Sequence, residues 1–231
     1  MFILDPMYLL MVIVPGLLIS GGASLLVRTA FNKYSKIPNR RGYTGARAAQ
    51  ALLDDAGIHD VSIVATHGYL SDHYNPQTRE LALSEQVYSS TSLAAVGVAC
   101  HEAGHAIQHA RNYAPLGFRS ALVPMAGIGS SIGYIVMAIG VFVHPYVVGF
   151  GILIFSAVLL FQLVTLPVEF DATARAKQLV LEAGIVDQDE RYGIDRVLNA
   201  AAMTYVAAVL TTLLTIAYYL WRSGLLGGSD D

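Results

Sequence analysis

YVVGFGILIFSAVLLFQLVTLPV, from Tyr146 to Val168, is an apolar stretch that meets no charged residue until Glu169. A helix needs about 20 predominantly apolar residues to cross the hydrocarbon core of a bilayer, and this stretch is long enough. Three further runs have a similar character, at residues 7–27, 118–143 and 200–221. Four such runs in 231 residues predict a mainly α membrane protein with four transmembrane helices, and buried helices of a soluble protein explain them less well.

The composition agrees with a membrane protein. Only 13% of the residues are charged and 55% are hydrophobic, whereas soluble domains carry about 25% charged residues. The net charge is −3, and without a basic tail or a nucleic-acid motif we expect no nucleic-acid partner. The first apolar run lacks a basic leading region and a cleavage site, so we predict a retained anchor. The lone Cys100 excludes an internal disulfide, and we expect a small buried side chain there.

The positive charges predict the topology. Nine of the 14 Lys and Arg residues lie within 28–119 and four lie within 168–199, which leaves only Arg222. Because basic residues gather on the cytoplasmic side of a membrane, both connecting regions are predicted to be cytoplasmic. The two termini and the turn at His144 and Pro145 are then expected outside.

We expect one membrane-integrated domain over 1–231, with cytoplasmic segments 28–117 and 169–199 that form a small α+β portion. The expected elements are a basic linker at 28–41, a helix at 44–58 capped by Thr44 and ended by Gly57, a strand at 61–65, a two-stranded hairpin at 69–84, and an amphipathic helix at 170–184.

The stretch HEAGHAIQH, residues 101–109, carries the chemistry. His101 and His105 are four residues apart, so on a helix both imidazoles face one ion, and Glu102 lies about 100° away. H-E-x-x-H in this form supplies two zinc ligands and a general base. The alternative is a helix whose histidines are merely exposed or hydrogen-bonded. The apolar run 93–100 before the motif is too short to span a bilayer, so the site is expected beside the membrane.

A catalytic zinc needs a third protein ligand. His109 lies about 12 Å along the helix from His101, too far for one ion, and is expected to be a polar or substrate neighbour. Glu169 is the better candidate because a carboxylate at the end of an apolar span is costly unless it is bound or exposed. Its alternative interpretation is an acid at the start of a helix, favoured by the helix dipole. Asp171 either orients a ligand imidazole or caps that helix, and His67 and His73 are weaker ligand options.

Three segments, HEAGHAIQH, YLSDHYNPQTRELALS and LPVEFDATARA, together resemble the bacterial YugP-like membrane zinc metallopeptidases. The resemblance covers nearly the whole chain, and a more distant one links it to membrane gluzincins of the HtpX and CAAX-protease kind. It implies a zincin-like portion, a bacterial inner-membrane location and one Zn²⁺ per chain. His101, His105 and Glu169 would be the ligands and Glu102 the base. The distant gluzincins carry an acid four residues after the ligand glutamate, whereas this chain has Thr173, and Asp171 is the candidate replacement.

The predicted function is that of a zinc-dependent endopeptidase at the cytoplasmic face of the membrane, with Glu102 as general base. Its partners would be the lipid bilayer, a peptide or protein substrate, and a second copy or another membrane protein. The competing hypothesis is a non-hydrolytic adaptor or assembly factor with a structural zinc site. A transporter fits less well because the spans lack ionisable groups. Candidates for stabilising an oxyanion are His109, Tyr113, Arg175 and Tyr192.

The hairpin at 69–84 precedes the motif helix and raises a second hypothesis. Its free edge would bind an extended peptide by strand addition. The alternative is an ordinary two-stranded element without a role in substrate binding.

Overall fold

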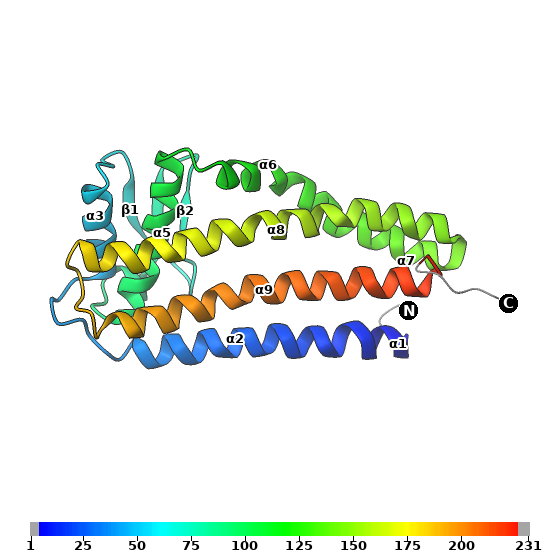
Figure 1. Cartoon of the computed structure of the whole chain (residues 1–231), viewed down its shortest axis with the longest axis horizontal. Helices are drawn as coiled ribbons and strands as arrows, with labels where there is room; N and C mark the ends of the chain where they lie inside the picture. The colour runs from blue at the N-terminus through cyan, green and yellow to red at the C-terminus, as the bar shows by residue number, and fades with distance from the viewer. Residues whose placement is uncertain (1–4, 226–231) are drawn as a thin grey trace. The chain divides into compact units, whose positions relative to one another are not determined.

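Four helical runs dominate the computed structural model, which describes residues 5–225 (Figure 1). Within these residues, the four are long and apolar enough to cross a membrane, with mean hydropathies between 1.8 and 2.6. The predicted number of long apolar helices is therefore confirmed. The first run comprises α1 (Pro6–Tyr8), a π-helical turn (Leu9–Ile13) and α2 (Val14–Tyr34); the second comprises α6 (Ala114–Ile128), a π-helical turn (Gly129–Gly133) and α7 (Tyr134–Val143); the others are α8 (Pro145–Glu182) and α9 (Arg191–Arg222).

All four helical runs extend beyond the predicted spans, and two of the extensions change the predicted elements. Helix α2 continues to Tyr34, into the expected linker, because residues 28–34 contain no helix breaker and Pro38 comes only later. Helix α8 joins the third span to the helix expected after it, although Pro167 lies inside. A proline removes one backbone donor, and long apolar helices tolerate this loss. The prediction that Glu169 begins a helix is wrong, since it lies in the interior of α8.

The described chain forms two compact units, and the first contains the greater part of the apolar helices. It comprises Phe118–Leu166 and the described parts of 1–24 and 204–231. Glycines set the packing of α7 against α8 within it: a Cβ at Gly140 would lie 2.6 Å from the backbone nitrogen of Val148, and one at Gly151 would lie 2.5 Å from that of Met137. Such small residues let two apolar helices approach at backbone distance.

The second unit, Leu25–Gly117 with Pro167–Met203, contains a small mixed sheet. Its strands are β1 (Ser62–Thr66), β2 (His73–Asn75) and β3 (Glu80–Ser84), in the order β1–β3–β2. The predicted hairpin is confirmed by the antiparallel pairing of β2 with β3, in which Tyr74 faces Leu81. The strand expected at 61–65 is β1, and its parallel pairing with β3 was not predicted.

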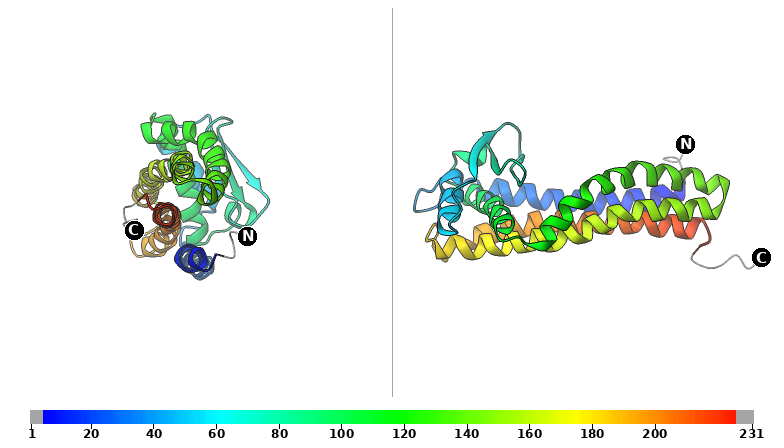
Figure 2. Two further views of the ribbon diagram at one scale, coloured as in Figure 1. Left: turned by 90° about the vertical axis from the view of Figure 1, so that its right-hand side faces the viewer. Right: turned by 90° about the horizontal axis from the view of Figure 1, so that it is seen from above.

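Three helices complete this unit: α3 (Gly45–Asp55), α4 (Glu85–Tyr88) and α5 (Leu93–Ala110). As predicted, Thr44 caps α3, and its hydroxyl accepts a hydrogen bond from the Arg47 nitrogen at 3.2 Å. Gly57 ends the element with a φ of +71°, which other residues adopt with strain. Figure 2 shows α3 and the sheet beside α5. Apolar side chains from all these elements and from the adjoining parts of α8 and α9 form one core, which includes Leu52, Leu81, Val96, Ile107, Val180 and Ile194.

Candidate metal centre

Helix α5 presents the motif histidines from the middle of the core. It begins at Ser92, whose hydroxyl accepts a hydrogen bond from the Ala95 nitrogen at 3.2 Å, as an N-cap does. Alanine and glycine occupy much of its length, so neighbouring elements pack closely around it. His101 and His105, four residues apart, therefore point from one side of a helix that is almost fully buried.

Gly104 brings α8 against this side of α5. A Cβ at Gly104 would lie 2.8 Å from the carbonyl oxygen of Ala172 and 3.3 Å from its Cα. Only a residue without a side chain permits this approach of two helix backbones. The contact lies between the two motif histidines in sequence, and on α8 it lies one turn beyond Glu169. It therefore sets the distance at which Glu169 meets the histidines.

The three candidate ligands lie together. His101 Nε2 is 3.2 Å from Glu169 Oε2, and His105 Nε2 is 3.5 Å from the same oxygen. One ligand atom from each residue lies within 4.8 Å of the other two. Zinc bonds of about 2.0–2.1 Å in tetrahedral geometry separate ligand atoms by about 3.3 Å. Two imidazole nitrogens and a carboxylate oxygen at these spacings fit a zinc ion that keeps its fourth position open.

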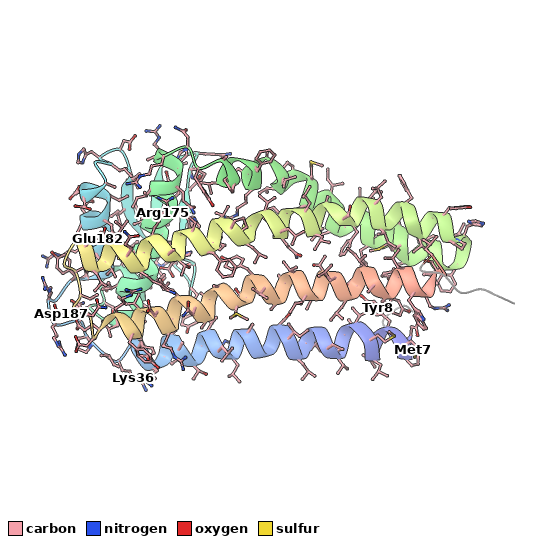
Figure 3. All side chains as sticks on the ribbon, viewed as in Figure 1. Met7, Tyr8, Lys36, Arg175, Glu182 and Asp187 are labelled. Atoms are coloured by element: carbon pink, nitrogen blue, oxygen red, sulfur yellow. The ribbon has the colours of Figure 1, made fainter. Side chains whose placement is uncertain are left out.

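A hydrogen-bonded chain orients His105. Its Nδ1 lies 3.0 Å from Gln108 Oε1, so Nδ1–H donates to the amide oxygen while Nε2 faces Glu169. The Gln108 amide nitrogen donates to the Val168 carbonyl and to Asp171, each at 2.8 Å. Arg175, labelled in Figure 3, ends this series of hydrogen bonds, because its Nε donates to Asp171 at 2.5 Å. Asp171 thus reaches His105 through Gln108, a residue that the sequence analysis missed.

Thr173 has the corresponding contact with His101. Its hydroxyl oxygen lies 3.2 Å from His101 Nδ1, and the threonine is buried. It stands four residues after Glu169. On α8 this spacing places Glu169 and Thr173 on one face, toward the same imidazole. The hydroxyl therefore contacts the other ring nitrogen of His101 than the one that lies near Glu169.

Glu102 is buried next to this group, with 9% of its surface exposed. Burial lowers the pKa of His105, but the hydrogen bond to Glu169 and the charge of Glu102 act against burial and leave the pKa above its ordinary value. The charge of Glu102 therefore reaches the cluster. The sequence predicted this proximity from the position of Glu102 beside the first histidine.

The other candidate side chains have partners elsewhere. His109 Nδ1 lies 2.8 Å from the Tyr74 hydroxyl on β2, one turn beyond His105. His67 contacts Glu85 at 2.8 Å, and His73 contacts the Ser71 carbonyl at the same distance, both on the surface. In the part of the chain that is described, none of these histidines joins the metal-binding group. Cys100 is fully buried, as expected, and burial raises the pKa of its thiol.

Comparison with known proteins now bears on the identity of this chain. Residues 8–224 match the model of a family described as "Putative neutral zinc metallopeptidase". The chain belongs to this family. It is also 40% identical over 210 residues to the "Putative membrane protease YugP" of Bacillus subtilis strain 168, which covers 90% of this chain and 92% of the relative. No solved structure matches.

Membership in the zinc metallopeptidase family confirms the YugP-like resemblance and implies zinc as the metal. The family, the relative and the four long apolar helices together make the chain a membrane member of a family of metal-dependent proteases. Within such a family, a buried group of two histidines and one glutamate is the place where the metal fits.

Proposed function

We propose that this protein is a zinc-dependent endopeptidase that hydrolyses peptide bonds at the cytoplasmic face of the membrane, with one zinc ion per chain. The observation that carries the proposal is the convergence of His101 Nε2 and His105 Nε2 on Glu169 Oε2, at 3.2 and 3.5 Å. These three residues are the proposed ligands. The H-E-x-x-H helix, the sheet and a glutamate ligand from a later helix support a zincin-like arrangement of the gluzincin type.

The proposed chemistry divides between the metal and Glu102. A zinc ion held by three protein ligands supplies a Lewis acid that activates water and polarises the scissile carbonyl. Glu102 takes the proton of the attacking water and passes it to the leaving amine. Its burial supports this role, because it places the carboxylate beside the proposed ligands and away from bulk solvent.

The neighbouring residues position the ligands in this scheme. Gln108 and Thr173 accept the Nδ1–H bonds of His105 and His101, which fixes each ring with Nε2 toward the metal. Among the four candidates for stabilising an oxyanion, Arg175 is engaged by Asp171 and His109 by Tyr74. Tyr113 lies against the Arg175 guanidinium, 5.9 Å from ring centre to Cζ, and Tyr192 lies against that of Arg196 at 5.7 Å.

The cellular placement forms part of the proposal. The excess of Lys and Arg in 28–119 and 168–199 supports a cytoplasmic site in a bacterial inner membrane, with both termini outside. The chain would act as a single membrane-integrated domain. The printed name of the Bacillus relative supports a protein or peptide substrate. We further propose that β2, an edge strand of the sheet, pairs with an extended substrate, since Tyr74 of β2 contacts the motif helix at His109.

The decisive experiment measures zinc content and proteolysis of the full chain in detergent. We compare the wild type with Glu102→Gln and Glu169→Ala, and use Glu85→Gln, an exposed glutamate, as the matched control. The wild type should hold one zinc and cleave. Glu102→Gln should keep its zinc and lose at least 100-fold in activity, since general bases contribute about 10²–10⁴-fold. Glu169→Ala should lose the metal, and Glu85→Gln should behave as the wild type.

The outcomes separate the two candidate functions. Normal turnover by Glu102→Gln would refute the proposed mechanism. Retention of zinc and activity by Glu169→Ala would refute its role as third ligand. Zinc bound without cleavage by the wild type, across a broad panel of membrane-protein substrates, would favour the adaptor with a structural zinc site.

A further inference from the structure

A cavity of about 370 Å³ lies between the end of α2 and the start of α9, within the second unit. Its walls include Leu26, Ala30 and Lys33 from α2, and Arg196, Asn199 and Met203 from α9. The volume is within the range of ligand pockets, about 300–1,000 Å³. We propose that this cavity binds one anionic phospholipid of the bilayer. The proposal does not depend on the proteolytic function.

The polarity of the cavity changes in the same direction on both helices. Along α2, the lining passes from Leu26 through Ala30 to Lys33 as the helix leaves its apolar run. Along α9, it passes from Arg196 to Met203 as the helix enters its apolar run. The cationic ends of the two walls therefore coincide, and so do the apolar ends. A phospholipid has the same order, with a phosphate at the water interface and acyl chains toward the membrane interior.

The two cations at the polar end contact aromatic rings. Lys33 Nζ lies 5.3 Å from the centre of the Tyr34 ring, and Arg196 Cζ lies 5.7 Å from that of Tyr192. Within residues 5–225 neither forms an ion pair, whereas Arg40 and Arg41 at the same end of α2 bind acids that precede α9, namely Asp189 and Asp187. Arg40 and Arg41 are thus neutralised, whereas Lys33 and Arg196 bring two uncompensated positive charges to the cavity, which complement a phosphate.

A neighbouring groove provides a contrast. It is larger, about 620 Å³, and it shares Asn199 with the cavity. Its cation Arg191 lies 3.5 Å from Asp195, and Lys177 donates to the Asn199 amide oxygen at 2.5 Å. Glu182 adds a negative charge to its wall. The charges of this groove therefore balance, and it lacks a positively charged end that would bind an anion. The proposed lipid site is the smaller cavity.

The test counts lipids bound to the purified full chain. Delipidated protein in detergent is titrated with dioleoyl phosphatidylglycerol or dioleoyl phosphatidylcholine, and bound lipid is counted by native mass spectrometry. The double variant Lys33→Gln/Arg196→Gln is compared with Arg28→Gln/Lys36→Gln, which removes the same charge from exposed sites near the end of α2 but outside the cavity (Lys36, Figure 3). A second variant, Ala30→Trp, fills the apolar part and leaves both cations in place.

The wild type should bind one phosphatidylglycerol per chain in preference to phosphatidylcholine. Each cation near an anionic headgroup contributes about fivefold in affinity, so the cavity variant should bind on the order of 25-fold more weakly. The control should stay within about twofold, and Ala30→Trp should lose the lipid. Zinc content should be unchanged in all variants. Equal affinity for the two lipids, equal losses in both double variants, or displacement of the lipid by glycerol 3-phosphate at similar concentration would overturn the proposal.

Discussion

Uncharged side chains orient both histidines of the metal centre. Gln108 contacts Nδ1 of His105 and Thr173 contacts Nδ1 of His101, while the carboxylate of Asp171 acts one step away through the Gln108 amide. A neutral acceptor fixes the tautomer of an imidazole and increases its basicity less than a carboxylate in direct contact. These contacts would therefore fix the orientation of the two proposed histidine ligands more than they increase the basicity of the imidazoles.

Replacement of Gln108 by methionine tests this arrangement at the residue scale. Methionine retains most of the buried volume but accepts no strong hydrogen bond, so His105 should lose its fixed orientation. Zinc affinity should fall about 10–100-fold, as is usual when a partner of a metal ligand is removed. Competition with a chelator of known affinity measures this change. Gln50→Met on the exposed side of α3 is the control, and an affinity equal to that of the wild type would contradict the role of Gln108.

Sequence pattern and hydropathy predicted some residues of the candidate site and missed others. The spacing of His101 and His105 identified the helix, and Glu169 stood out as a charge at the end of an apolar run. Gln108 was missed because glutamine is an ordinary helical residue. Its spacing of three from His105 and seven from His101 was the signal, since both spacings place it on their face. The roles of all these residues stay predictions until metal binding is measured.

The elements were predicted more reliably than their pairing. Caps, apolar periodicity and turns located α3, α5 and the hairpin, because these signals are local. The parallel pairing of β1 with β3 could not be predicted, because no local sequence feature specifies which residues of the two strands pair. Packing of the tertiary core determines this register. The continuity of α8 through Pro167 was missed because a proline usually indicates a helix boundary.

Gly104→Ala tests the contact between α5 and α8. Alanine in a helix is normally more stable than glycine, by up to about 1 kcal/mol. At Gly104, however, the new Cβ meets the Ala172 backbone, and overpacking should cost about 1–3 kcal/mol and displace Glu169. The thermal unfolding temperature and the affinity for zinc should both decrease. Gly117→Ala is the control because no atom of another element lies within 4 Å of its Cβ position, and a similar rise in stability for both variants would refute the argument.

A proline in β2 tests the proposed pairing of substrate with the sheet edge. His73→Pro removes a backbone donor from this strand and should raise the KM for peptide cleavage severalfold while the zinc content is unchanged. Ser62→Pro in β1, the opposite edge strand, is the matched control and should alter KM less. Equal kinetics of His73→Pro and the wild type would argue for a sheet without a part in substrate binding.

For the whole molecule, the proposed topology follows from the distribution of charge among four long apolar helices. An even number of spans returns the chain to the side on which it began, so both termini must share a side if all four cross the bilayer. The cytoplasmic assignment of the second unit rests on the positive residues alone.

Cysteine labelling in intact cells checks this topology. The native Cys100 is fully buried, so the wild type should not react with a membrane-impermeant maleimide. His144→Cys, in the exposed turn between α7 and α8, should be labelled from outside. Lys36→Cys and Asp187→Cys should react only after the cells are opened. Labelling of Lys36→Cys in intact cells would reverse the assignment.

The separation of the candidate ligands along the chain has a consequence for biosynthesis. Glu169 follows His101 by 68 positions, and the whole of α6 and α7 is made between them. A nascent chain therefore exposes two of the three proposed zinc ligands long before the third leaves the ribosome. Two ligands hold zinc weakly, so the enzyme would stay inert while its helices enter the membrane and would become active only when α8 docks against Gly104. The order of synthesis would thus protect the insertion machinery from a premature protease.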